Sequence, residues 1–195
     1  DKHGHGTHVS GIVAALTDNA LGVAGMAPEV RLANVKVMSD VGEGFWSSIA
    51  EGLLWAADNG AHVINMSFGG GPSQIVEDAV NYAWSKGVVI VASAGNSGSN
   101  VPMYPAFYPN CIAVAATDVN DQRSAFSNYG DWVDLAAPGE NILSTVPVDG
   151  HPLGTPSGYM NLSGTSMAAP HVAGLAALLF PLMPDQNGDG RVNDE

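Results

Sequence analysis

The sequence contains little positive charge and only one cysteine. Its 6 Lys plus Arg stand against 19 Asp plus Glu, giving a formal net charge of -13 at pH 7. Nucleic acids and anionic membranes attract proteins through clustered positive charge, so this balance argues against both as partners. The single Cys111 excludes an intramolecular disulfide, and the apolar run that follows it predicts a packed, unreactive thiol.

Long apolar runs are scarce as well. We expect no stretch that spans a bilayer, and the sequence shows no signal peptide. A chain of 195 residues with 46% hydrophobic content can nevertheless bury one sizeable core. One domain is therefore expected.

The remaining pattern predicts an α/β fold. Short apolar runs alternate with segments of helical period, which is typical of βαβ units and of a mostly parallel sheet between helices. Apolar residues recur three and four apart over 49–57 and 75–83, and residues 165–182 predict a long buried helix with Pro170 in its first turns. The expected strands are 32–38, 62–66, 88–92 and 112–116.

Two motifs near opposite ends of the chain point to chemistry. Gly4–Gly11 (Gly-His-Gly-Thr-His-Val-Ser-Gly) offers His5 as a base, and Gly164–Gly174 (Gly-Thr-Ser-Met-Ala-Ala-Pro-His-Val-Ala-Gly) offers Ser166 as a nucleophile. A third block, Ala92–Asn96 (Ala-Ser-Ala-Gly-Asn), lies between them. In this order the blocks resemble the subtilisin-like serine proteases (subtilases, peptidase family S8), and the resemblance runs along nearly the whole chain. It implies the three-layer subtilisin-like fold, here truncated at both ends.

The resemblance implies a catalytic role for three residues. Ser166 would attack the peptide carbonyl to form an acyl-enzyme, His5 would take and return the proton, and the Asn96 amide would join the Ser166 N–H in stabilising the oxyanion. The family's catalytic Asp belongs to an Asp-Ser/Thr-Gly turn upstream of the His block and is not in this chain. Asp1 matches a different, non-catalytic family position. We therefore expect residues 1–184 to be a partial catalytic domain that is inactive or very weak by itself.

The resemblance also implies polypeptide substrates. An extended peptide would pair with an edge at Ser67, Phe68 and Gly69, opposite a segment that contains Gly42 and Gly44. Trp46 either walls an apolar substrate pocket or is a helix-start aromatic residue that packs on the core. His8 and His171 are expected to be structural and to form hydrogen bonds within their own helices.

Two segments suggest structural Ca²⁺ in the parent protein. The first resembles the family's calcium loop, with the Asn19 side-chain oxygen and the carbonyls of Leu16, Leu21 and Val23 as ligands, although the family's upstream carboxylate ligands are absent. The alternative is a polar surface loop without metal.

The second segment, 185–195, has the spacing of an EF-hand loop, and its ligand positions would be Asp185, Asn187, Asp189 and Arg191. Position twelve of such a loop falls just beyond the chain. A dockerin-like module that begins here and an acidic, solvated tail are the alternatives.

Two functions stay open on the sequence. The first is a secreted serine endopeptidase with a possible pro-segment outside this chain; secretion rests on the family resemblance alone. The second is a catalytically inactive relative that binds peptides in the same cleft, which would require the upstream Asp to be replaced.

Overall fold

The computed structural model describes residues 1–183. The larger sheet has the strands β1 (Val63–Met66), β2 (Val89–Ser93), β3 (Ile112–Thr117) and β4 (Leu135–Pro138), and the smaller has β5 (Ile142–Thr145) and β6 (Tyr159–Leu162). The helices are α1 (His5–Ala14), α2 (Trp46–Asp58), α3 (Gln74–Ser85), α4 (Thr165–Leu179) and the 3-10 helix η1 (Phe180–Leu182). The α/β class expected from the sequence is confirmed.

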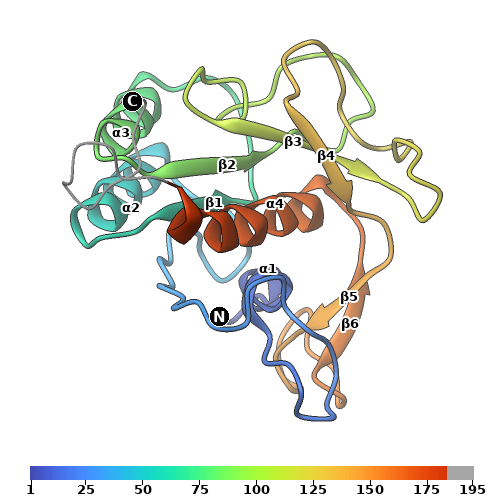
Figure 1. The fold of residues 1–195 in the computed structure, drawn as a ribbon. Helices are drawn as coiled ribbons and strands as arrows, with labels where there is room; N and C mark the ends of the chain where they lie inside the picture. The colour runs from blue at the N-terminus through green and yellow to red at the C-terminus, as the bar shows by residue number, and fades with distance from the viewer. Residues whose placement is uncertain (184–195) are drawn as a thin grey trace.

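The larger sheet is parallel throughout, with the strand order β1-β2-β3-β4. Successive residues of its strands point to opposite faces, as the period of two requires. Ile90 and Ala92 belong to the buried cluster with α2 and α3, whereas Val91 and Val114 belong to the cluster with α4. The sheet is therefore the middle of three layers, with α4 on one face and the α2–α3 pair on the other (Figure 1).

Helix α4 is the central helix of the molecule. It packs against all four strands of the larger sheet and, on its other side, against α1. By length and composition alone the window Thr165–Leu182 would suffice to cross a membrane, with a mean hydropathy of 1.4, so the expectation that no such stretch exists was wrong. The core helix of a soluble protein passes the same test, and 44% of this window is buried inside the fold.

One predicted strand is absent. Residues 32–38 form no β-ladder with any described residue, and a strand exists only where a neighbouring backbone supplies hydrogen-bond partners. Val37 and Met38 instead pack against the buried hydrophobic cluster that α2 and α3 form with the larger sheet. The sequence analysis also missed β4, β5 and β6, which are only four residues long and lack a long apolar run.

The antiparallel pair β5–β6 lies beside α1, which packs against β5 (Figure 1). His8 lies fully buried at this junction, and its Nε2 donates to the carbonyl oxygens of Ile142, at 3.1 Å, and Met160, at 3.0 Å. The prediction that His8 bonds within its own helix was therefore wrong, because its ring faces the neighbouring strands. His171 does bond within its helix, with 2.8 Å between Nδ1 and the Met167 oxygen.

Candidate active site

The site is built at the start of α4, where the helix begins beside the ends of β1 and β2. Ser166 lies in the first turn, and its Oγ donates to the Ser67 carbonyl oxygen at 3.2 Å. In return the Ser67 Oγ donates to the Ser166 carbonyl oxygen at 2.8 Å, and it accepts a bond from Asn65 Nδ2 at 2.9 Å. Two hydrogen bonds thus join the segment that follows β1 to Ser166, the predicted nucleophile.

Asn96, which follows β2, is oriented by Thr165. Its Oδ1 accepts bonds from the Thr165 N–H at 2.8 Å and the Thr165 hydroxyl at 2.9 Å, and that hydroxyl accepts one from the Gly95 N–H at 3.0 Å. Because two donors occupy Oδ1, the Nδ2 group must point to the other side. The sequence analysis named Asn96 but missed Thr165, whose only signal was its place directly before Ser166.

Gly164 shows where the two expected oxyanion donors meet. A Cβ atom added to this glycine would lie 3.4 Å from Asn96 Nδ2 and 3.7 Å from the Ser166 backbone nitrogen. Both N–H donors therefore flank the same small space at the N-terminal end of α4, where the helix dipole also favours negative charge. Such a pair of fixed donors can stabilise a developing oxyanion.

His5 is the first residue of α1, the helix that packs against α4. Burial lowers the pKa of its imidazole below the ordinary value of 6.5, and the nearby His3 and His8 lower it further. The ring is therefore neutral near pH 7 and keeps a lone pair for a proton. Among residues 1–183 no hydrogen bond joins His5 to Ser166, whose hydroxyl is directed to Ser67 instead.

The Asp1 side chain forms hydrogen bonds with backbone N–H groups at the start of α1. Its carboxylate accepts bonds from the N–H groups of His3 (3.1 Å), Gly4 (3.1 Å) and Thr7 (2.7 Å), and from the Thr7 hydroxyl (3.1 Å). A carboxylate at a helix N-terminus satisfies free N–H groups and complements the helix dipole. Asp1 therefore positions the His block, and its hydrogen bonds do not include the His5 ring.

The residues expected to bind substrate fall into two groups. Gly69 and Gly70 follow Ser67 and Phe68, and Gly70 forms an antiparallel bridge with Tyr104, with N–H···O distances of 2.8 and 3.2 Å. A Cβ added to Gly70 would lie 2.7 Å from Cζ2 of Trp46, so the indole lies against this segment. The same ring packs on the core cluster, so both interpretations of Trp46 fit its position.

Gly42 lies in a turn beside His3, whereas Gly44 lies against Val37 and Met38. The turn that contains Gly42 is closed by a bond from the Ser39 N–H to the Glu43 oxygen at 2.7 Å. Gly42 has a φ of +82°, and a Cβ there would lie 3.5 Å from Nε2 of His3. The structure thus places this segment next to His3, which neighbours His5 with ring centroids 6.5 Å apart.

Comparison with known proteins identifies the family of this chain. A model described as the subtilase family matches residues 1–189. The chain belongs to the subtilase family. It is 54% identical to thermitase of Thermoactinomyces vulgaris over 91% of this chain and 61% of thermitase, and 52% identical to subtilisin BL of Lederbergia lenta over 92% of this chain and 64% of that protein. The chain thus spans less than two thirds of the length of these relatives.

Solved structures give the same fold. A protease structure from Pseudoalteromonas arctica matches with a TM-score of 0.85 and 41% identity, over 95% of this chain and 60% of that one. The crystal structure of a cold-adapted subtilisin-like serine proteinase matches with a TM-score of 0.79 and 39% identity, over 92% and 62%. The expected subtilisin-like architecture is therefore confirmed.

The residues predicted to bind calcium in the first segment of this subtilase lie together in one loop. Residues 16–24 line a shallow hollow, where Asn19 Oδ1 accepts the Leu21 N–H at 3.0 Å and Asp18 is the one carboxylate of the loop. Nowhere in residues 1–183 do three His, Cys, Asp or Glu side chains gather as a metal site. Calcium binding by this loop stays a prediction. Asp185, Asn187, Asp189 and Arg191 lie outside the described residues.

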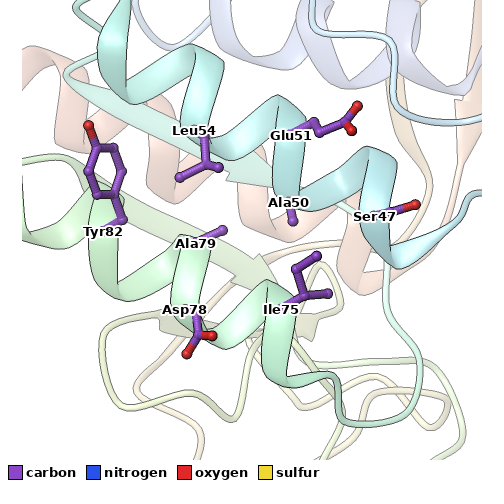
Figure 2. Close-up of a pocket in the computed structure, with 8 residues that line it drawn as sticks. All are labelled: Ser47, Ala50, Glu51, Leu54, Ile75, Asp78, Ala79 and Tyr82. Atoms are coloured by element: carbon purple, nitrogen blue, oxygen red, sulfur yellow. The ribbon is translucent and has the colours of Figure 1, made fainter.

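A further groove lies between α2 and α3 (Figure 2). Ala50, Leu54, Ile75 and Ala79 form its apolar part, and Glu51 and Asp78 stand beside it. These helices cover the sheet face opposite α4, so the groove is not part of the site around Ser166.

Proposed function

We propose that this subtilase chain carries the nucleophile, the base and the oxyanion site of a serine endopeptidase. The observation that supports this most directly is the convergence of Asn96 Nδ2 and the Ser166 N–H beside Gly164. A packed core would not require a side-chain amide and a backbone N–H to converge on one space at the first turn of α4. A site for acyl transfer does require them.

In the proposed reaction the Ser166 hydroxyl adds to the carbonyl carbon of a peptide bond. His5 takes the hydroxyl proton while negative charge builds on the carbonyl oxygen, where the Asn96 amide and the Ser166 N–H donate to it. The C–N bond then breaks, and His5 returns the proton to the departing amine. Water attacks the acyl-enzyme by the same route and releases the acid.

The proposal assigns the third triad member to a carboxylate outside this chain. No carboxylate of residues 1–183 forms a hydrogen bond with the His5 ring, and Asp1 is engaged with backbone N–H groups. Without a carboxylate partner the imidazole is not held in one tautomer, nor is its cation stabilised. The 195-residue chain alone should therefore be inactive or very weak.

The test uses the full-length protein that contains this sequence. It should hydrolyse an unfolded polypeptide such as casein, and an aryl sulfonyl fluoride should abolish that activity and label Ser166 in a tryptic peptide map. Ser166→Ala should remove both hydrolysis and label, while the exposed Ser157→Ala should keep both. Binding of casein peptides without hydrolysis or label would refute the proposal and support the peptide-binding alternative.

Calcium binding and secretion stay predictions of the family resemblance. No step above depends on calcium. Thermal unfolding of the full-length protein with Ca²⁺ and with EDTA tests the first, and an unchanged midpoint would exclude a stabilising site. Fractionation of the producing cells tests the second, and activity confined to the cell interior would contradict it.

A further inference from the structure

The loop that joins β5 to β6 lies against the residues that immediately precede His5. The N–H of Leu153 donates to the His3 carbonyl oxygen at 3.1 Å. His151 Nδ1 lies 3.3 Å from the Lys2 carbonyl oxygen, and since a carbonyl only accepts, Nδ1 carries the proton. The loop thus binds the carbonyl groups of two successive residues.

The Cβ atom of Leu153 also lies against Gly4. A Cβ added to Gly4 would lie 2.8 Å from Cβ of Leu153 and 3.2 Å from Cδ of Pro147, so the loop and the glycine are in close contact. Gly4 has a φ of +102°, which side-chain-bearing residues rarely adopt. The contact therefore requires a glycine both for its shape and for its small size.

Gly4 determines where α1 begins. Its carbonyl oxygen accepts the His8 N–H at 3.0 Å, which is the first helical bond around His5. The N–H groups of His3 and Gly4 donate to the Asp1 carboxylate. The carbonyl oxygens of Lys2 and His3 accept hydrogen bonds from the loop. Asp1 and the loop together therefore satisfy the backbone polar groups that precede the base.

Hydrogen bonds hold the loop together and tie it to β6. The Thr155 N–H donates to the Pro147 oxygen at 3.1 Å, and the Gly154 N–H donates to the His151 oxygen at 2.9 Å. The Thr155 hydroxyl donates to the Tyr159 oxygen at 3.0 Å, which ties the loop to β6. Just before the loop, Thr145 Oγ1 donates to the Thr7 oxygen at 3.0 Å.

We propose that Leu153, carried by the loop 147–158, is a positioning residue for His5. The proposal rests on the proposed role of His5 as the base. Leu153 holds Gly4 against the loop and so sets the position and tilt of the first turn of α1. Proton transfer is sensitive to such placement, since a displacement of about 1 Å can lower a rate by about a hundredfold. Loss of the side chain should therefore slow the reaction without changing how substrate binds.

The experiment compares Leu153→Gly with Val148→Gly in the full-length protein. Leu153→Gly removes the Cβ that contacts Gly4, whereas Leu153→Ala keeps it. Val148 belongs to the same loop but is 66% exposed, so Val148→Gly is a matched control for a new glycine in the loop. For Leu153→Gly we expect kcat to fall about tenfold with KM within about twofold of the wild type. Val148→Gly should leave both constants unchanged, and Leu153→Ala should recover most of kcat.

A second readout does not depend on turnover. The His5 ring and the Gly4 amide are followed by NMR across a pH titration in the wild type and both glycine variants. Their resonances should shift in Leu153→Gly and stay in place in Val148→Gly. If the wild type shows no hydrolysis, the proposed function fails, while this measurement still decides whether Leu153 positions His5.

Three results would overturn the proposal. One is an unchanged kcat in Leu153→Gly; another is a rise in KM alone, which would mean that the loop contacts substrate. The third is an unmoved His5 resonance. If Leu153→Gly does not fold, Leu153→Val, which adds a methyl group at the Cβ beside Gly4, should lower kcat about two- to threefold, and an unchanged kcat in that variant would overturn the proposal.

Discussion

The starts of α1 and α4 carry the two residues proposed for proton transfer, yet they are held by different means. At α4, Thr165 is completely buried and bonds to Gly95 and Asn96 at the ends of the central strands. At α1, the supports are the exposed Asp1 carboxylate and the loop 147–158 of the outer hairpin. The proposed nucleophile is therefore anchored next to the core, whereas the proposed base depends on a peripheral layer.

This difference orders the effects of substitutions. Changes at α4 should cost both turnover and global stability, because the same buried hydrogen bonds serve both. Changes at α1 should lower turnover with a smaller loss of stability, because a local opening of the outer layer leaves the sheet intact.

The largest effect is expected from Asn96→Leu in the full-length protein. Loss of one oxyanion donor should lower kcat about 100- to 1,000-fold with little change in KM, because the bond is made only in the transition state. Steady-state kinetics on a peptide substrate measure this, with the exposed Asn120→Leu as control. A fall of less than about threefold would remove Asn96 from the oxyanion site.

Thr165→Val should have the next largest effect. The substitution keeps the volume but leaves the Gly95 N–H without its acceptor and Asn96 Oδ1 with one donor fewer. We expect a loss of about 1–3 kcal/mol in the free energy of unfolding, with a lower kcat as the Asn96 amide loosens. Urea unfolding and kinetics on the same sample check both. A full kcat with reduced stability would show that Thr165 does not orient Asn96.

Asp1→Ala tests the α1 side of the comparison. It removes the acceptor for three backbone N–H groups and a favourable charge at the helix start. Loss of such a cap costs about 1 kcal/mol, so kcat should fall several-fold with only a small change in global stability. Hydrogen exchange should locate the loosening in α1. An effect as large as that of Thr165→Val on unfolding would contradict the division into core and periphery.

The smallest effect is a pH dependence of stability that arises at His8. Burial lowers the pKa of His8 below 6.5, because a proton on its buried Nδ1 would find no acceptor while Nε2 serves two carbonyls. Below pH 6.5 the unfolded chain therefore binds more protons at His8 than the folded chain does. The contribution of neutral His8 to the free energy of unfolding is fully present above pH 6.5, and it is lost as the pH falls through the pKa of His8 in the folded state.

His171 in α4 also has a pKa lowered by burial, so it is the internal comparison. Hydrogen exchange between pH 8 and 5 should show α1 and the β5–β6 pair loosening before α4, because His8 bridges α1 to the two outer strands. The variant His8→Gln should flatten the pH dependence of the outer layer. Equal loosening of α1 and α4 would remove His8 as its cause.

Local patterns predicted much of the fold. The spacing of apolar residues in 49–57 and 75–83 located α2 and α3, and three of the four expected strands lie where the short apolar runs placed them. The fourth, 32–38, failed because a strand needs a paired neighbour that a single segment cannot reveal. The strands of the β5–β6 pair were too short to give a periodic signal.

The sequence alone determined which residues carry the proposed chemistry, because each lies in a compact motif with its own local signature. The order of the blocks around His5, Asn96 and Ser166 was enough to place the chain in its family. The tertiary structure decided what supports them: Thr165 beneath Asn96, Leu153 beside Gly4, and the strands around His8. These contacts join residues as far apart as His8 and Met160, which are separated by 152 positions, so only the folded chain brings them together.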